Sequence, residues 1–212
     1  MVIAILFVLA YLIGSIPTAV IVSKRLYGID IREHGSGNAG ATNAFRVMGS
    51  KVGSGVMLAD VLKGFLAAKL ALFSAYSWDS EAITNLQVFL GLAAVLGHIF
   101  PIWADFKGGK GIATLFGMII SIQPTVAICL VVVFVVMLFL TRYVSLSSIS
   151  ASIAFPLLIL FIFRMPEVSY RVFAIATACL VVLTHYKNIS RLLNGNENKV
   201  PLFKKRRQQE EE

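Results

Sequence analysis

The chain of 212 residues is 58% hydrophobic and only 14% charged, with a mean hydropathy of +0.82 and a formal net charge of +8. Soluble domains carry about 25% charged residues, so this composition excludes an ordinary soluble domain and predicts an integral membrane protein. The basic excess is assigned to membrane topology and anionic lipid headgroups rather than to nucleic acid, because no basic patch interleaved with aromatic residues is present.

The first apolar segment, residues 1–22, contains no charged side chain. As a helix it would measure about 33 Å, enough to cross a hydrocarbon core of about 30 Å. A secretory signal peptide carries basic residues before its apolar run, whereas here Lys24 and Arg25 follow it. The pattern therefore predicts a retained first helix, with the N-terminus outside and the following loop in the cytoplasm.

Further apolar segments are predicted over residues 52–74, 84–103, 112–141, 145–163 and 168–184. The segment 112–141 would form a helix of about 45 Å, which is too long for one crossing. Pro124 lies near its middle and predicts a break. We therefore expect two short helices, 112–122 and 124–141.

The distribution of basic residues supports this break. Seven crossings would place fifteen lysines and arginines on the cytoplasmic side and only Arg164 and Arg171 outside, whereas six crossings would give nine against eight. The positive-inside rule favours seven. The sequence thus predicts an all-α integral membrane protein of about seven transmembrane helices, with the N-terminus outside and the C-terminus cytoplasmic. Residues 1–195 would form a single transmembrane domain and residues 196–212 a charged, disordered cytoplasmic tail.

The segment "DIREHGSGNAGATNAFR", residues 30–46, contains a Gly-x-Gly-x-x-Gly pattern. A dinucleotide site would need a strand before this pattern, and a membrane helix precedes it instead. Glycines still allow backbone N–H groups to point toward an anion. A flexible linker is the alternative, and the density of asparagine and threonine favours anion binding. The predicted site residues here are Gly35, Ser36, Gly37, Asn38, Gly40, Thr42, Asn43 and, as a fixed cation, Arg46; His34 has no evident partner.

A second glycine-rich segment, "FKGGKG" at residues 106–111, precedes the predicted helix at 112–122. Lysines and glycines at a helix N-terminus form a site for phosphate. The spacing is not that of a nucleotide-binding P-loop. Simple anchoring at the membrane surface would explain the lysines but not the glycines, so we predict anion binding by Lys107, Gly108, Gly109 and Lys110.

Five further polar residues interrupt or adjoin the apolar segments. Asp60 and Lys63 are three residues apart within a predicted membrane helix, and we expect them to neutralise each other and support the neighbouring loops. His185 and Asn188 share one face of a helix and, next to an anion site, would bind hydroxyl groups. His98 is interpreted as a buried histidine with its hydrogen bonds satisfied. No array of carboxylates suits a metal ion, so neither a metal nor a cofactor is expected.

Five segments together resemble a known family: "GSIP" (14–17), residues 30–46, "DVLKG" (60–64), "GHIFPIWADFKGGKGIAT" (97–114) and "HYKNISRLLNG" (185–195). They are similar, in the same order, to the bacterial acyl-phosphate:glycerol-3-phosphate acyltransferases of phospholipid synthesis. Only the tail after about residue 196 lies outside the resemblance.

The resemblance implies a seven-helix enzyme of the bacterial cytoplasmic membrane, with its active site facing the cytoplasm. It implies transfer of a fatty acyl group from acyl phosphate to the 1-hydroxyl of glycerol 3-phosphate, giving lysophosphatidic acid and phosphate. Membrane lipid and the two substrates are the implied partners, with no nucleic acid, cofactor or obligatory protein partner. By the same resemblance, Ser36, Arg46 and Lys110 hold the phosphate of glycerol 3-phosphate, His185 and Asn188 orient its hydroxyls, and Gly37, Asn38, Gly40, Thr42 and Asn43 hold the acyl phosphate.

Three alternatives stay open at the level of sequence. A transporter or channel for a phosphorylated solute would also combine membrane helices with an anion site, although transporters usually contain internal repeats and none is visible here. An acyltransferase could instead form an acyl-enzyme on Ser36. A non-catalytic lipid-binding subunit is the third alternative.

Overall fold

The computed structural model describes residues 1–76 and 80–200, and all regular structure within these ranges is helical. The α-helices are α1 (Val2–Ser15), α2 (Thr18–Tyr27), α3 (Ala41–Lys69), α4 (Glu81–Ile99), α5 (Ile112–Ile122), α6 (Pro124–Thr141), α7 (Val144–Leu157), α8 (Val168–Thr184) and α9 (Tyr186–Leu193). Short 3₁₀ turns follow as η1 (Ile31–Glu33), η2 (Leu70–Phe73) and η3 (Ile102–Ala104), and a π-helical turn η4 (Leu158–Ile162) extends α7.

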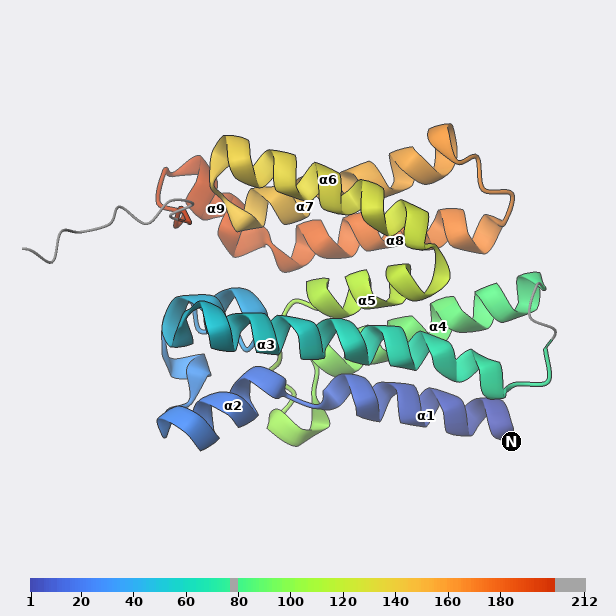
Figure 1. The fold of residues 1–212 in the computed structure, drawn as a ribbon, viewed down its shortest axis with the longest axis horizontal. Helices are drawn as coiled ribbons and strands as arrows, with labels where there is room; N and C mark the ends of the chain where they lie inside the picture. The colour runs from blue at the N-terminus through green and yellow to red at the C-terminus, as the bar shows by residue number, and fades with distance from the viewer. Residues whose placement is uncertain (77–79, 201–212) are drawn as a thin grey trace, which may run out of the picture.

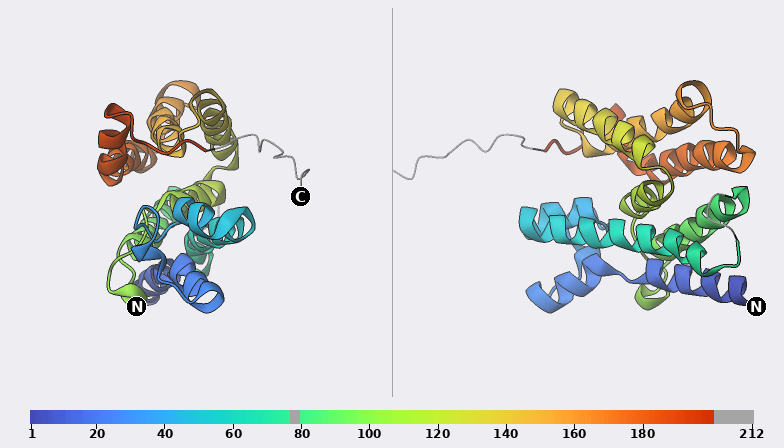
Figure 2. Two further views of the ribbon diagram at one scale, coloured as in Figure 1. Left: turned by 90° about the vertical axis from the view of Figure 1, so that its left-hand side faces the viewer. Right: turned by 45° about the vertical axis from the view of Figure 1, so that its right-hand side comes forward.

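The long helices lie side by side along one axis, in two groups (Figures 1 and 2). One group contains α1 to α4, the other contains α6 to α9, and the short helix α5 lies between them. The N-terminus lies at the same end of the bundle as the start of α4 and the start of α8, whereas the end of α2, the start of α3 and α9 lie at the opposite end (Figure 1). The chain therefore alternates between the two ends.

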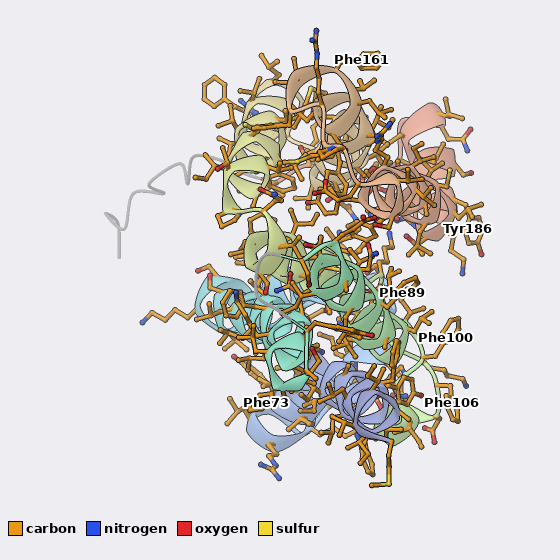
Figure 3. The ribbon with its side chains drawn as sticks, turned by 90° about the vertical axis from the view of Figure 1, so that its right-hand side faces the viewer. Phe73, Phe89, Phe100, Phe106, Phe161 and Tyr186 are labelled. Atoms are coloured by element: carbon orange, nitrogen blue, oxygen red, sulfur yellow. The ribbon has the colours of Figure 1, made fainter. Side chains whose placement is uncertain are left out.

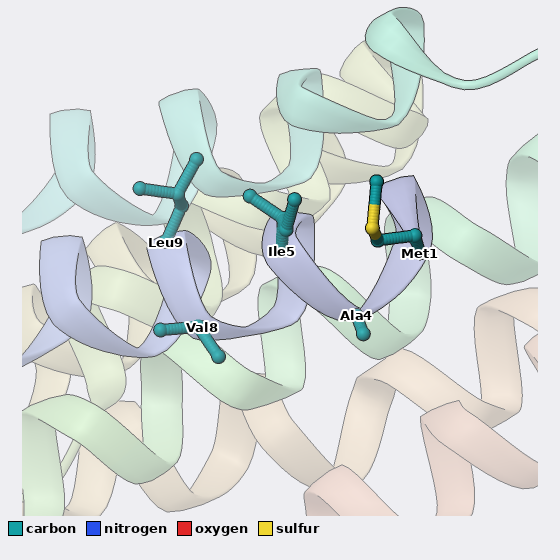
Figure 4. A pocket seen from close by; sticks show the side chains of 5 residues that line it. All are labelled: Met1, Ala4, Ile5, Val8 and Leu9. Carbon is teal, nitrogen blue, oxygen red and sulfur yellow. The ribbon is translucent and has the colours of Figure 1, made fainter.

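The exterior of the bundle is apolar, as lipid contact requires. Large exposed side chains such as Phe89, Phe100, Phe161 and Tyr186 point away from the helices (Figure 3). An open surface pocket on α1 is lined only by apolar residues, Met1, Ala4, Ile5, Val8 and Leu9 (Figure 4). Four helical stretches among the described residues are long and apolar enough to cross a membrane, or five if α8 and α9 count as one bent span. The chain is thus an all-helical integral membrane protein.

The first predicted helix is not continuous in the structure. Instead of one helix over residues 1–22, α1 ends at Ser15 and α2 begins at Thr18. Ile16 adopts φ −59° and ψ 110°, because a proline disfavours helical geometry at the preceding residue and has no N–H to donate. Pro17 therefore breaks the first membrane segment, and the break leaves the Ile16 carbonyl available to another helix.

α3 starts at Ala41, inside the glycine-rich segment, and consists of two helical parts joined at a kink; the second part corresponds to the predicted segment 52–74, whose last residues form η2. Its first turns are separated from the rest at Gly49, which adopts φ 83°. A β-carbon on Gly53 would lie 2.7 Å from the Phe45 Cα, so the two parts of α3 pack closely. Thr42, Asn43 and Arg46 consequently lie on a helix and not in a loop.

The break predicted at Pro124 is confirmed, because α5 and α6 have the bounds expected from the sequence. Glycines allow α5 to approach α3 closely. A β-carbon on Gly64 or on Gly117 would lie 1.9 Å from a carbonyl oxygen of the other helix. Small residues permit such close helix packing within membranes, and here they hold the first turns of α5 against the second part of α3, around Val61 and Gly64.

Candidate active site

Asn43 organises the first glycine-rich segment from within. Its side-chain oxygen accepts a hydrogen bond from the Ser36 N–H at 2.9 Å, and its amide nitrogen donates to the carbonyls of Ile31 (3.1 Å) and His34 (2.9 Å). Only 1% of Asn43 is exposed. We predicted that Asn43 binds the anion directly, and the structure instead gives its side chain an internal role: it holds the turn in which Gly35 adopts φ 63°.

An ion-pair network tethers this segment to the second glycine-rich segment. Arg32 forms a salt bridge of 2.7 Å with Asp30 and donates a hydrogen bond of 3.0 Å to the Ala104 carbonyl. The bond from the Arg32 guanidinium outweighs burial and holds the pKa of Asp30 far below its ordinary value. The His34 ring, for which the sequence indicated no partner, lies 3.0 Å from the Asp30 carbonyl oxygen through Nδ1.

The second glycine-rich segment is seated on the end of α4. The N–H groups of Gly108 and Gly109 donate to the carbonyls of Ile99 and His98, each at 3.1 Å. The two segments meet at this point, because a β-carbon on Gly40 would lie 3.9 Å from the Gly109 Cα. Gly40 and Gly111 are the N-terminal caps of α3 and α5. Two helix N-termini, each with unpaired N–H groups and a partial positive charge, therefore open onto one place.

Lys110 extends from this place to the second group of helices, where its ammonium group donates a hydrogen bond to the Asn188 side-chain oxygen. The pKa of Lys110 is lowered to about 8, mainly by burial; the charge of Glu197 opposes this effect, and the charges of Arg191 and Arg46 add to it. The influence of Arg46 places a second cation near Lys110, and Arg46 itself is exposed. Of the three cations that the sequence predicted, Arg46, Lys107 and Lys110, the structure thus brings Arg46 and Lys110 together.

His185 lies at the junction of α8 and α9, where the chain bends by 61°. Its Nδ1 lies 2.8 Å from the Val181 carbonyl oxygen, so Nδ1 carries the ring proton and Nε2 is an acceptor. Burial, and next the charge of Lys110, lower the pKa of His185 to about 4. The ring is therefore neutral near pH 7 and suited to accept a hydrogen bond from a hydroxyl group.

Glu197 is the site residue that the sequence prediction missed, since it lies in the predicted tail. It accepts hydrogen bonds from Ser145 (2.9 Å), Asn188 (2.7 Å) and Arg191 (2.6 Å). Gly195 adopts φ 70° and returns the chain to α9. Burial would raise the pKa of Glu197, and these three bonds lower it below its ordinary value. The spacing of a glycine and a glutamate after Arg191 was the signal available in the sequence.

Replacing Glu197 by alanine is expected to lower the stability of the fold by about 2 kcal/mol, because hydrogen bonds to a charged group contribute about 1.5–3 kcal/mol. For a chain of this size the loss corresponds to a fall of about 4–8 °C in the thermal unfolding temperature, which calorimetry in detergent would measure. Glu197→Gln keeps acceptors for Ser145 and Asn188 and should lose less. An unchanged unfolding temperature in the alanine variant would contradict this role.

The remaining predicted site residues differ in their exposure and in their distance from Lys110. Lys107 and Ser36 are exposed, whereas Gly109 is buried. Asp60 and Lys63 form the expected pair, with 2.8 Å between carboxylate and ammonium, below the second glycine turn and not beside Lys110. Cations, N–H groups and a neutral imidazole thus surround one place between the two groups of helices. Such a place suits a phosphate joined to a hydroxyl-bearing group.

Comparison with known proteins gives a consistent result. Residues 4–195 match the family described as glycerol-3-phosphate acyltransferase. A glycerol-3-phosphate acyltransferase of Bacillus velezensis is 45% identical over 203 residues, covering 96% of this chain and 100% of the relative. The corresponding protein of Chlorobaculum parvum is 43% identical over 216 residues, covering 90% and 93%.

Two solved structures share the fold. The crystal structure of PlsY (YgiH), an integral membrane glycerol 3-phosphate acyltransferase, in its glycerol 3-phosphate form has a TM-score of 0.84 at 39% identity, covering 93% of this chain and 95% of that one. The lysophosphatidic acid form has a TM-score of 0.81 at 38% identity, covering 93% and 94%. The chain therefore belongs to the glycerol-3-phosphate acyltransferase family of integral membrane enzymes.

Proposed function

We propose that this enzyme transfers a fatty acyl group from acyl phosphate to the 1-hydroxyl of glycerol 3-phosphate, giving lysophosphatidic acid and phosphate. One observation carries the proposal: the N-termini of α3 and α5 meet at Gly40 and Gly109, beside Lys110 and the neutral ring of His185. Both substrates contain a phosphate that bears about −1.5 to −2 charges, and the solved relatives bind glycerol 3-phosphate and lysophosphatidic acid.

Each group has a role in the proposed reaction. Ser36, Arg46 and Lys110 hold the phosphate of glycerol 3-phosphate, and His185 and Asn188 orient its hydroxyls. The backbone from Gly37 to Thr42 holds the acyl phosphate. The hydroxyl oxygen attacks the acyl carbon, the bond from that carbon to the phosphate oxygen breaks, and the departing phosphate accepts the hydroxyl proton. The protein contributes positioning and charge stabilisation.

Direct transfer is favoured over an acyl-enzyme on Ser36. The Ser36 side chain is exposed, and no described side chain forms a hydrogen bond with its hydroxyl. A serine nucleophile requires an adjacent base for activation. Labelled acyl phosphate without acceptor should therefore leave no covalent adduct, and a stable adduct on Ser36 would favour the alternative.

The proposal includes the orientation in the membrane. We infer seven crossings, with α3 and the short helix α5 added to the five apolar spans, the N-terminus outside, and the end that carries α9 in the cytoplasm. The alternation of the chain between two ends supports this arrangement (Figure 1). Cysteine labelling in intact cells tests it: residues introduced near Lys51 and near Lys187 should both react only after the membrane is permeabilised.

The activity is tested by mixing purified enzyme with acyl phosphate and glycerol 3-phosphate in the presence of a chelator. Lysophosphatidic acid and phosphate should appear in equal amounts. Acyl-CoA and acyl-carrier protein serve as competing donors in parallel reactions. If product forms from another donor but not from acyl phosphate, the proposed donor is wrong and the proposed acceptor still holds.

The pH dependence should show the titration of Lys110. Because burial lowers its pKa to about 8, the ammonium form that binds phosphate is present below pH 8 and is lost as pH rises through that value. The kcat/KM for glycerol 3-phosphate should fall tenfold per pH unit above about 8. Initial rates between pH 6 and 10 would measure this fall, and a constant kcat/KM up to pH 10 would contradict it.

A further inference from the structure

Three ionisable side chains lie together below the active site without taking part in the proposed reaction. Asp60 and Lys63 belong to α3 and His98 to α4, with exposed fractions of 1%, 5% and 7%. We call these three residues the buried triad. Charged groups in a membrane interior are costly unless paired, so their presence next to the second glycine turn needs a reason.

Lys63 joins the triad to the broken first membrane segment. Its ammonium group lies 2.8 Å from the Asp60 carboxylate, 2.8 Å from the Ile16 carbonyl oxygen and 3.1 Å from Nδ1 of His98. An ammonium group can only donate, so the Ile16 carbonyl and Nδ1 of His98 accept hydrogen bonds from it, whereas its contact with Asp60 is an ion pair. The Ile16 carbonyl lies outside regular helix because Pro17 interrupts the helix there, and it accepts from the Thr18 N–H at 2.9 Å as well as from Lys63, so the break and the triad belong to one arrangement.

The same contacts fix the ring of His98. Since Nδ1 accepts a hydrogen bond from the Lys63 ammonium, the neutral ring carries its own proton on Nε2. The Nε2 edge lies against Gly109, where a β-carbon would be only 2.2 Å away. The His98 carbonyl also accepts the hydrogen bond from the Gly109 N–H. Ring and backbone of one residue therefore hold the glycine that precedes Lys110.

We propose that the buried triad is a positioning unit: it holds the end of α4 and the Gly108–Gly109 turn in register, and thereby sets where the Lys110 ammonium lies. None of its members touches substrate. The effect of the triad on acyl transfer rests on the proposed function, whereas its effect on the position of Lys110 does not. The competing explanation is that Asp60 and Lys63 only neutralise each other and stabilise the fold.

Two sets of changes separate these explanations. His98→Asn keeps an oxygen acceptor near the position of Nδ1 for Lys63 and removes the ring edge against Gly109. The pair Asp60→Asn with Lys63→Met removes both charges together, because removal of one alone would leave a buried uncompensated charge. Leu90→Ala is the control: Leu90 is fully buried on α4, so its truncation lowers stability without reaching the turn.

The pH at which Lys110 titrates separates the two explanations. It should not change if the buried triad only stabilises the fold. Lysine labelled with ¹³C at Cε is incorporated biosynthetically, and the Lys110 signal is assigned by its loss in Lys110→Arg. The charged or titratable groups that face Lys110 are Arg46 from α3, His185 from the end of α8, Arg191 from α9 and Glu197 from the turn after it. None of these is changed in the variants.

In both triad variants, the Lys110 signal should titrate at least one pH unit above the wild-type value, because a displaced ammonium is less buried. The kcat/KM for glycerol 3-phosphate should fall at least tenfold, mainly through a higher KM. Leu90→Ala should lower the unfolding temperature and leave both measurements unchanged per folded molecule. If the double variant does not fold, His98→Asn decides the matter alone.

The proposal is overturned if the triad variants behave like Leu90→Ala, with lower stability, an unchanged Lys110 titration and an unchanged kcat/KM. Failure of the proposed function gives a different pattern. The wild-type enzyme would then make no lysophosphatidic acid, whereas the Lys110 titration would still shift in the triad variants. The two results are read from separate measurements on the same samples.

Discussion

Lys110→Ala should abolish acyl transfer while the protein still inserts and folds. The Lys110 ammonium joins the turn at the start of α5 to Asn188 on α9, at the place where we propose that phosphate binds. Removing one group that stabilises developing charge costs about 10²–10³ in rate, and the loss of a phosphate-binding cation adds weaker substrate binding. We expect kcat/KM for glycerol 3-phosphate to fall at least about a thousandfold.

Arg46→Ala should have a comparable effect, because Arg46 supplies the second cation near Lys110. Arg46→Lys should recover only part of the activity, since an ammonium cannot form the two parallel bonds of a guanidinium. Lys51→Ala removes an exposed lysine from the same helix and controls for the general loss of positive charge. Near-normal turnover by purified Lys110→Ala or Arg46→Ala would refute the assignment of the site.

Gly108→Ala should be nearly as damaging through geometry alone. A β-carbon at this position would lie 1.9 Å from the His98 carbonyl oxygen and 2.6 Å from the Pro101 ring. The first contact is with backbone at the end of a helix, which cannot rotate away, so the turn that precedes Lys110 must move. We expect at least about a hundredfold loss of kcat/KM, since displacement of a catalytic group by about 1 Å costs about that factor.

Gly55→Ala provides the matched control for this change. A β-carbon on Gly55 would meet no atom within 4 Å, and the residue lies within α3, where alanine is a better helix former by about 1 kcal/mol. Its activity should be normal and its unfolding temperature equal or higher. Equal activity of the two alanine variants would show that the close seating of Gly108 on α4 is not needed for transfer.

Much of the helix pattern could be predicted from composition and length. The break at Pro124 was visible because the apolar run was too long for one crossing. Pro17 has the same chemistry, but it lies in a segment of ordinary length, so nothing in the sequence demanded a break there. The start of α3 was missed because Gly49 and the charges of Arg46 and Lys51 suggest a loop. Gly49, at φ 83°, joins the two helical parts of α3, of which the first contains Arg46 and the second contains Lys51.

The candidate site was predictable in its residue types but not in its arrangement. Lys110 and Arg46 were recognised because cations beside glycines at a helix start indicate anion binding. Asn43 has the same polar character as its neighbours, and only the folded chain shows that its side chain is used within the turn. Glu197 lies 52 residues from Ser145, a pairing that no local pattern specifies.

The shortness of α5 has a consequence for how the two reactants meet. Eleven residues span about 17 Å, roughly half of the hydrocarbon core. If the far end of α5 reaches the outer boundary, its beginning lies well below the inner surface. In the proposed orientation, the donor's hydrocarbon tail would stay among lipid chains throughout, and the hydrophilic acceptor would descend into a recess to reach it.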